Sequence, residues 1–167
     1  GVPLVYVNQY GGNDDLVFHD DTWEWDGATW TLQAPATRPL ARRHPGMAYD
    51  VIGERVVMFG GSPDEDGHVL DDTWAYDGAG QWQLVPSELS PPARDIPGLA
   101  FDPIHGRIVM FGGEAANEMF ADTWELIGDA WTEVPTAIAP PGRFNHMLTY
   151  VPSLERTVLF GGYSHAF

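Results

Sequence analysis

One apolar string ending in two glycines recurs along the chain, and it constrains the fold more than any other feature of the sequence. It reads Val-Val-Met-Phe-Gly-Gly at 56–61, Ile-Val-Met-Phe-Gly-Gly at 108–113 and Thr-Val-Leu-Phe-Gly-Gly at 157–162. A degenerate copy, Tyr-Val-Asn-Gln-Tyr-Gly-Gly, occupies 6–12. The copies lie roughly 50 residues apart, a period typical of propellers and solenoids. The sequence therefore predicts stacked repeats and not a single-core fold.

A second motif, Asp-Thr-Trp, recurs in phase with the diglycines. It occupies 21–23, 72–74 and 122–124, and each copy is followed by another tryptophan, at positions 30, 82 and 131. An arginine also precedes each of the last three diglycines at one constant spacing: Arg42, Arg94 and Arg143. Because several motifs keep one period, the repeat covers almost the whole chain.

Each repeat divides into four short segments, separated by glycine, proline and aspartate clusters that favour turns. In one repeat the first segment is 45–49 and the second is the apolar run 55–59, which lacks polar alternation. In the third segment Trp74 and Tyr76 stand two apart and so project to one side of a strand. The pattern predicts a four-stranded antiparallel sheet per repeat, with proline-rich connections at 34–39, 86–92 and 135–141.

A small sheet with apolar residues on both faces cannot bury them alone and has to stack on further copies. The repeated tryptophans are expected to supply much of the contact between sheets, since burying one is worth about 1.5–3 kcal/mol or more. The diglycines are expected to adopt positive φ and to allow close backbone approach at the exit of an inner strand.

Composition excludes several functional classes. Acidic residues outnumber basic ones 24 to 8, and the net charge of -16 repels a phosphate backbone, so no nucleic-acid partner is expected. The sequence has no cysteine, which excludes disulfides, thiolate metal sites and a cysteine nucleophile. No apolar run approaches the length of a membrane span, so no membrane-spanning segment is expected.

These motifs together resemble the kelch repeat: an arginine-led first strand, an apolar strand ending in Phe-Gly-Gly, then Asp-Thr-Trp and a second tryptophan. The resemblance implies an all-β fold of kelch-type β-propeller blades, each a four-stranded antiparallel sheet set radially about a channel. One departure concerns the histidine that often follows the first-strand arginine. His146 matches it, but Pro45 and Pro97 stand at the equivalent positions.

The blades are expected at about 1–34, 40–86, 92–135 and 141–167. The first lacks its opening strand and the last has only its first two strands, whereas kelch propellers commonly have about six or seven blades. One chain is therefore expected to form an incomplete ring. Either two copies associate, so that each covers the other's exposed end, or further blades belong to a longer chain.

The resemblance also implies where a ligand would bind, namely just after the diglycines and near the start of each first strand. The candidate residues at these positions are polar and differ between repeats, as a binding surface on a fixed scaffold should. They are Asn13, Arg43, His44, Ser62, Glu114, Asn145, His146, Tyr163 and Ser164. In contrast, Arg42, Arg94 and Arg143, with Asp21, Asp72 and Asp122, recur unchanged and are expected to be structural.

Metal and enzyme chemistry have weaker signals. Asp64 and Asp66 form a weak calcium candidate without the downstream ligands of a calcium loop, and His19–Asp21, with nitrogen and oxygen ligands, is a second weak metal candidate. No cofactor is expected. Among the catalytic kelch proteins, the copper radical oxidases need a cysteine, and the iron-dependent specifier proteins need a Glu-x-x-x-Asp-x-x-x-His motif that no histidine here completes. A sugar mutarotase, using Glu114 with Arg43 or Arg94, stays open.

The sequence therefore predicts a non-catalytic binding module that presents variable polar loops to a protein segment or a glycan. A carbohydrate-active propeller enzyme, such as a sugar mutarotase or isomerase, is the alternative. A third interpretation is a structural part of a larger secreted protein. An extracellular or periplasmic location is favoured.

Overall fold

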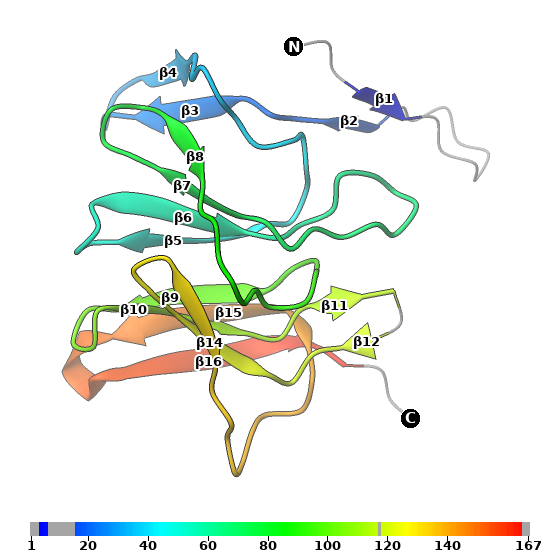
Figure 1. The fold of residues 1–167 in the computed structure, drawn as a ribbon, viewed down its shortest axis with the longest axis vertical. Helices are drawn as coiled ribbons and strands as arrows, with labels where there is room; N and C mark the ends of the chain where they lie inside the picture. Colours follow the sequence, from blue (N-terminus) through cyan, green and yellow to red (C-terminus); the bar gives the residue numbers. More distant parts are fainter. Residues whose placement is uncertain (1–3, 7–15, 117, 165–167) are drawn as a thin grey trace.

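The computed structural model describes residues 4–6, 16–116 and 118–164, and over these residues the chain is all-β (Figure 1). The strands are β1 (Leu4–Tyr6), β2 (Leu16–Phe18), β3 (Thr22–Trp25), β4 (Trp30–Gln33), β5 (Gly46–Asp50), β6 (Arg55–Phe59), β7 (Thr73–Tyr76), β8 (Trp82–Leu84), β9 (Gly98–Asp102), β10 (Arg107–Phe111), β11 (Glu114–Ala115), β12 (Glu118–Met119), β13 (Thr123–Ile127), β14 (Ala130–Glu133), β15 (Phe144–Val151) and β16 (Arg156–Tyr163). One short 3-10 turn, η1 (Pro152–Leu154), joins β15 to β16.

Four sheets follow one another along the chain and are stacked (Figure 1). The first sheet is β3–β4, the second is β5–β6–β7–β8, the third is β9–β10–β13–β14 and the fourth is β15–β16. The two middle sheets are four-stranded and antiparallel, as the repeat predicted. Two short hairpins, β1–β2 and β11–β12, complete the described strands.

The repeat in sequence is a repeat in strand register. Phe59 of β6 lies opposite Thr73 of β7, and Phe111 of β10 lies opposite Thr123 of β13. The predicted second strand of the opening copy, 6–12, falls mostly outside the described residues. β1 overlaps this predicted strand only at Tyr6 and pairs with β2, and among the described residues β3 pairs only with β4.

In both middle sheets the recurring arginine, whose side chain is buried, forms an ion pair with the recurring, partly buried aspartate. Arg94 donates to both carboxylate oxygens of Asp122 at 2.7 Å and to the carbonyl of Gly112 at 3.0 Å. The indole of Trp124 donates to the same carboxylate at 2.7 Å. Burial acts to raise the pKa of Asp122, but the Arg94 and Trp124 donors outweigh burial and hold the pKa below its ordinary value.

The second sheet repeats this arrangement with Arg42, Asp72, Gly60 and Trp74. The structural role that the sequence predicted for the arginines and aspartates is thus seen in both complete sheets.

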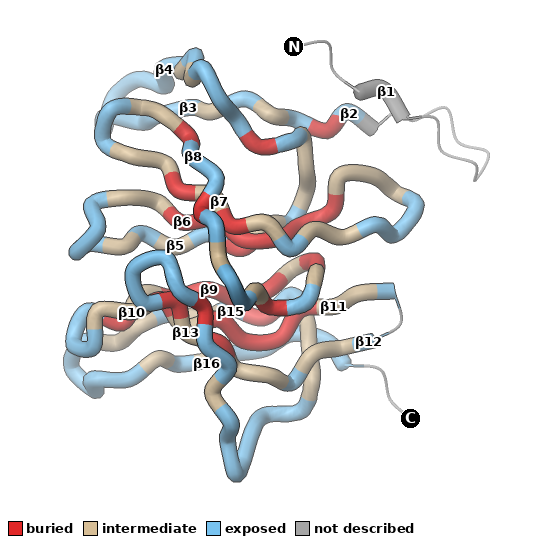
Figure 2. The backbone as a smooth tube through the Cα atoms, viewed as in Figure 1, coloured by how far each residue is buried: buried red, intermediate tan, exposed pale blue. Residues whose placement is uncertain are grey.

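A hydrophobic core lies between the second and third sheets, where buried residues concentrate in Figure 2. Trp131 packs edge-on against Phe59, with ring centroids 5.4 Å apart. Its indole donates to Thr73 Oγ1 at 2.9 Å, across the junction between the two sheets. Trp82 makes the same bond to Thr22, from the second sheet to the first. The second tryptophan of a repeat therefore joins its sheet to the preceding one.

The first sheet differs because, among the described residues, no sheet covers its outer face. Trp23, Trp25 and Trp30 are exposed there, whereas Trp82, Trp124 and Trp131 are buried. The tryptophan contacts predicted from the repeat therefore form only between neighbouring sheets.

The diglycines after β6 and β10 hydrogen-bond to the segment that leads into the next sheet. Gly112 and Gly113 have φ of 66° and 99°, and the amide of Gly113 donates to the carbonyl of Arg143 at 2.9 Å. A Cβ on Gly112 would stand 2.5 Å from that same carbonyl oxygen. Positive φ and close approach, both expected from sequence, thus bring the next arginine loop into place. No helix among the described residues is long and apolar enough to cross a membrane.

Candidate binding surface

The loops that follow the diglycines interlock with the segments that precede the first strands. Arg43 and Ser62 exchange two backbone hydrogen bonds of 2.9 and 3.0 Å, and Asp95 and Glu114 exchange two of 2.8 and 2.9 Å. The loop between β6 and β7 and the β11–β12 hairpin project on the same side of the stack, at the right in Figure 1. Arg43, Asp95 and Glu114 therefore belong to one surface at the junction of the second and third sheets, and the buried Ser62 holds the backbone of Arg43.

The centre of this surface is an imidazole–carboxylate pair formed between two repeats. His44 Nδ1 lies 3.2 Å from Asp95 Oδ2. The His44 side chain is half exposed, whereas the Asp95 side chain is nine-tenths buried. Burial raises the pKa of Asp95, and the neighbouring His44 and Arg43 only partly offset it. His44 also has a φ of 53°, in the left-handed region, as do its counterparts Ile96 and Asn145.

Two buried polar atoms on this surface have no hydrogen-bond partner, the second carboxylate oxygen of Asp95 and Arg43 Nε. The Arg43 guanidinium lies over the ring of Phe18, 5.8 Å from its centroid. A buried polar atom without a partner costs about 1–3 kcal/mol. Because both atoms are buried, their unmade hydrogen bonds are a cost in stability that the two unrepeated residues bring to this junction.

Asp95 was not among the residues predicted from sequence. The sequence did contain a signal for Asp95. It follows Arg94 as Arg43 follows Arg42, and these two equivalent residues, Arg43 and Asp95, have opposite charges. Its importance comes from its contact with His44 of the preceding repeat, and the spacing of the motifs does not reveal that contact.

Ser62 and His146 lie inside the protein. The Ser62 hydroxyl donates to the carbonyl of Asp64 at 2.7 Å. His146 is buried edge-on against Phe111, with ring centroids 5.7 Å apart, and neither ring nitrogen has a partner. Burial and the nearby positive charge of Arg143 lower the pKa of His146. It is therefore a neutral, packed imidazole and does not face a ligand.

Other predicted residues lie at the next junction or elsewhere. Asn145, Tyr163 and Ser164 are exposed near the fourth sheet, where Tyr163 packs on Phe144 with centroids 5.8 Å apart. Asn13 lies outside the described residues. Arg94, considered for a mutarotase, is fully buried in its pair with Asp122.

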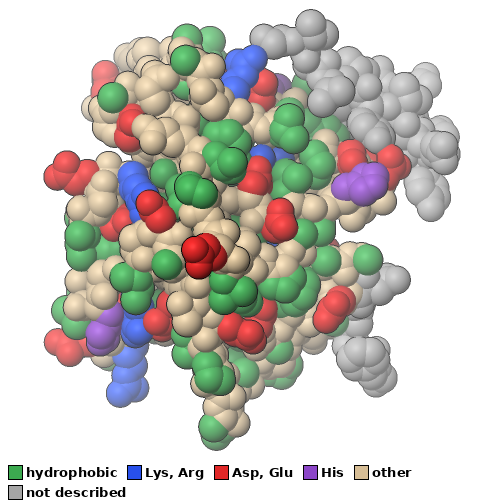
Figure 3. Space-filling model, viewed as in Figure 1, with side chains coloured by type: hydrophobic (Ala, Val, Ile, Leu, Met, Phe, Trp, Pro, Cys, Tyr) green, Lys and Arg blue, Asp and Glu red, His purple; other side chains and the backbone are tan. Residues whose placement is uncertain are grey.

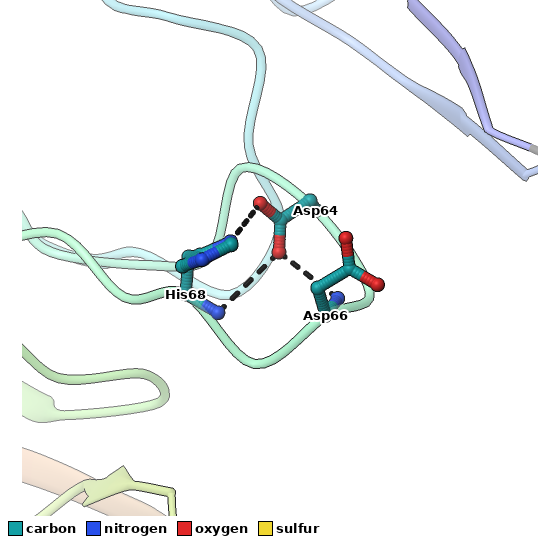
Figure 4. A group of neighbouring side chains, drawn as sticks. All are labelled: Asp64, Asp66 and His68. Carbon is teal, nitrogen blue, oxygen red and sulfur yellow. Dashed lines mark hydrogen bonds and ion pairs between the residues drawn. The ribbon is translucent and has the colours of Figure 1, made fainter.

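The predicted calcium candidates, Asp64 and Asp66, lie close to His68, which the sequence did not single out (Figure 4). One ligand atom of each residue falls within 4.8 Å of the others. His68 Nδ1 lies 2.6 Å from Asp64 Oδ2, and Asp64 Oδ1 accepts the amides of Asp66 and His68. The hydrogen bond and the charge of Asp64 raise the pKa of His68. The loop is thus closed by its own hydrogen bonds.

The fold defines an all-β repeat protein of stacked antiparallel sheets. No family model matches the chain, and no curated protein sequence matches it. The resemblance to kelch repeats therefore rests on the repeat motifs.

Proposed function

We propose that this chain is a kelch-type propeller segment that acts as a non-catalytic binding module. Its ligand surface is the junction of the second and third sheets, with Arg43, His44, Asp95 and Glu114, and its ligand is a protein segment or a glycan. The observation that carries the proposal is the contrast between repeated and unrepeated polar residues.

The repeated polar residues are used inside the scaffold. Each middle-sheet arginine is bound to its aspartate, and both junction tryptophans are bound to threonines. The unrepeated residues Arg43 and Asp95 instead retain buried polar atoms without partners. Donors and acceptors side by side suit hydroxyl-rich or peptide ligands, which present both kinds of group.

A glycan array and a peptide array probed with the 167-residue chain test the proposal. His44→Ala is the diagnostic variant, and His105→Ala is its control. His105 Nδ1 lies 2.7 Å from Asp102 at the far end of β9, so the control loses a similar pair elsewhere. Spots bound by the wild type and by His105→Ala, but lost with His44→Ala, are the expected result. Absence of any bound spot, or equal binding by both variants, would contradict the proposal.

A carbohydrate-active enzyme is the second candidate. One observation favours it, because Asp95 has a raised pKa and lies within hydrogen-bond distance of a half-exposed imidazole. Such a carboxyl can serve in general acid–base chemistry. Polarimetry of the mutarotation of free sugars, with the wild type and with Asp95→Asn, separates the two candidate functions. A binding module gives no mutarotation rate above that in buffer.

A further inference from the structure

Among the described residues, the first and fourth sheets supply between them the four strands of one complete sheet. β3 carries the Asp-Thr-Trp motif of β7 and β13, so β3–β4 corresponds to the last two strands of a complete sheet. β16 carries the Phe-Gly-Gly motif of β6 and β10, so β15–β16 corresponds to the first two. The two halves lie at opposite ends of the stack (Figure 1), and one copy cannot join them.

Each half has a free strand edge among the described residues. β6 and β10 each pair on both sides, whereas β16 pairs only with β15, and β3 only with β4. β1 does not occupy the edge of β3, because it pairs with β2. A free edge presents unpaired backbone donors and acceptors to another strand.

Arg143 makes the same backbone hydrogen bonds as Arg94 but has no aspartate partner among the described residues. Arg94 donates to the carbonyls of Pro92 and Gly112, and Arg143 donates in the same way to Pro141 and Gly161, all at 3.0 Å. Arg94 then binds Asp122. Across the described part of the chain, no carboxylate pairs with Arg143.

Asp21 makes the same tryptophan hydrogen bond as Asp122 but has no arginine partner among the described residues. It accepts the indole of Trp23 at 2.7 Å, as Asp122 accepts that of Trp124. Asp122 also binds an arginine, whereas no described arginine contacts Asp21, whose side chain is 43% exposed. Arg143 and Asp21 thus carry opposite charges and each lacks the partner that the other supplies.

The apolar groups are also complementary. Phe160 is 80% exposed, whereas its counterpart Phe59 is fully buried in a core that includes Leu99, Met110 and Trp131. The residues equivalent to these three are Met47, Met58 and Trp82. They line a hollow of about 270 Å³ beside β3, together with Asp21 and Thr22. A strand paired to β3 would place its phenylalanine there.

We propose that two copies of this chain join through these halves, with β16 of one copy pairing antiparallel to β3 of the other. The registers of the middle sheets place Phe160 opposite Thr22 and Val158 opposite Glu24. Arg143 then binds Asp21 of the second copy. The exposed indole of Trp30 in one copy then donates to Thr123 of the other copy. Trp82 donates to Thr22, and Trp131 to Thr73, in the same way within one copy.

The contact is made twice, so a two-fold dimer closes on itself. Two complete sheets from each copy and two composite sheets give six in all, a number within the range of closed propellers.

One local adjustment is required, because Met147 stands where the middle sheets have Gly46 and Gly98. Met47, exposed and unbranched, turns aside to admit it. The inference rests on the sheets and does not depend on a ligand.

Engineered cysteines test the register, because the chain has none of its own. Glu24→Cys with Val158→Cys, in one chain, should oxidise to a species of twice the 18.4 kDa chain mass. Glu24→Cys with Arg156→Cys is the control, two residues out of register. Equal cross-linking of both pairs, or none in the first, overturns the proposal.

Sedimentation equilibrium tests the contacts. The wild type should be a dimer, and Phe160→Glu a folded monomer by circular dichroism, while Ile104→Glu, at an exposed hairpin turn, should remain dimeric. Arg143→Asp should weaken the dimer at least about tenfold, and adding Asp21→Arg should restore it. A monomeric wild type, or a dimer that survives Phe160→Glu and Arg143→Asp, overturns the proposal.

Discussion

The indole Nε1 of Trp131 donates a 2.9 Å hydrogen bond to Thr73 Oγ1, joining the third sheet to the second through a fully packed junction. Both residues are buried. The bond therefore couples the burial of a large aromatic side chain to a fixed position of the neighbouring sheet.

Thr73→Val should destabilise the protein, because it keeps the shape of the side chain but leaves the Trp131 indole without an acceptor. The expected loss is about 1–3 kcal/mol, measured by urea unfolding. Thr31→Val in the exposed strand β4 is the matched control and should change stability by less than about 0.5 kcal/mol. Equal stability of the two variants would show that the junction does not depend on this bond.

Arg94→Ala should be among the most damaging substitutions, since it leaves Asp122 partly buried without its guanidinium. The expected cost is about 3–5 kcal/mol. Arg38, which pairs with Asp20 at 3.0 Å on the surface, offers the control. Arg38→Ala should cost less than about 1 kcal/mol. Similar melting curves for the two variants would refute the structural role of the repeated arginine.

The same pair predicts a pH dependence. The pKa of Asp122 is held below its ordinary value of 3.8, so the folded state binds fewer protons there than the unfolded state. The stabilisation is complete above pH 3.8 and is lost as the pH falls through the folded pKa. Unfolding free energies of wild type and Arg94→Ala, measured from pH 7 down to pH 3, should therefore converge at the acid end. A constant difference would contradict the assignment.

His146→Phe should stabilise the protein under mildly acidic conditions. The pKa of His146 is lowered by burial and by Arg143, so protonation of the unfolded chain below pH 6.5 costs the wild type stability. Phenylalanine fills the site without the two unpartnered nitrogens and removes this dependence. Thermal melts at pH 7.5 and pH 5.5 should show a larger decrease for the wild type than for the variant.

The motifs predicted the scaffold because each repeats a local requirement. Phe-Gly-Gly marks an apolar strand followed by two residues at positive φ. In Asp-Thr-Trp, the aspartate carboxylate accepts a hydrogen bond from the indole of the tryptophan two residues later. Those are short-range relationships, which a periodic sequence displays.

The candidate site was less predictable because it forms across repeats. His44 meets Asp95 only when two sheets stack, and His146 becomes buried for the same reason. The exposure of Trp30 likewise depends on which sheet lies beside it, and no local pattern distinguishes it from Trp82 or Trp131.

Asp95→Asn tests most directly whether unrepeated residues are kept for binding at a cost in stability. Burial raises the pKa of Asp95, so the ionised side chain opposes folding as the pH rises from below 3.8 through the folded pKa. Melting temperature and array binding, measured together at pH 7, should show a variant at least as stable as the wild type that no longer binds the wild-type ligands. A variant that melts lower and binds the same ligands would contradict the proposed role of this surface.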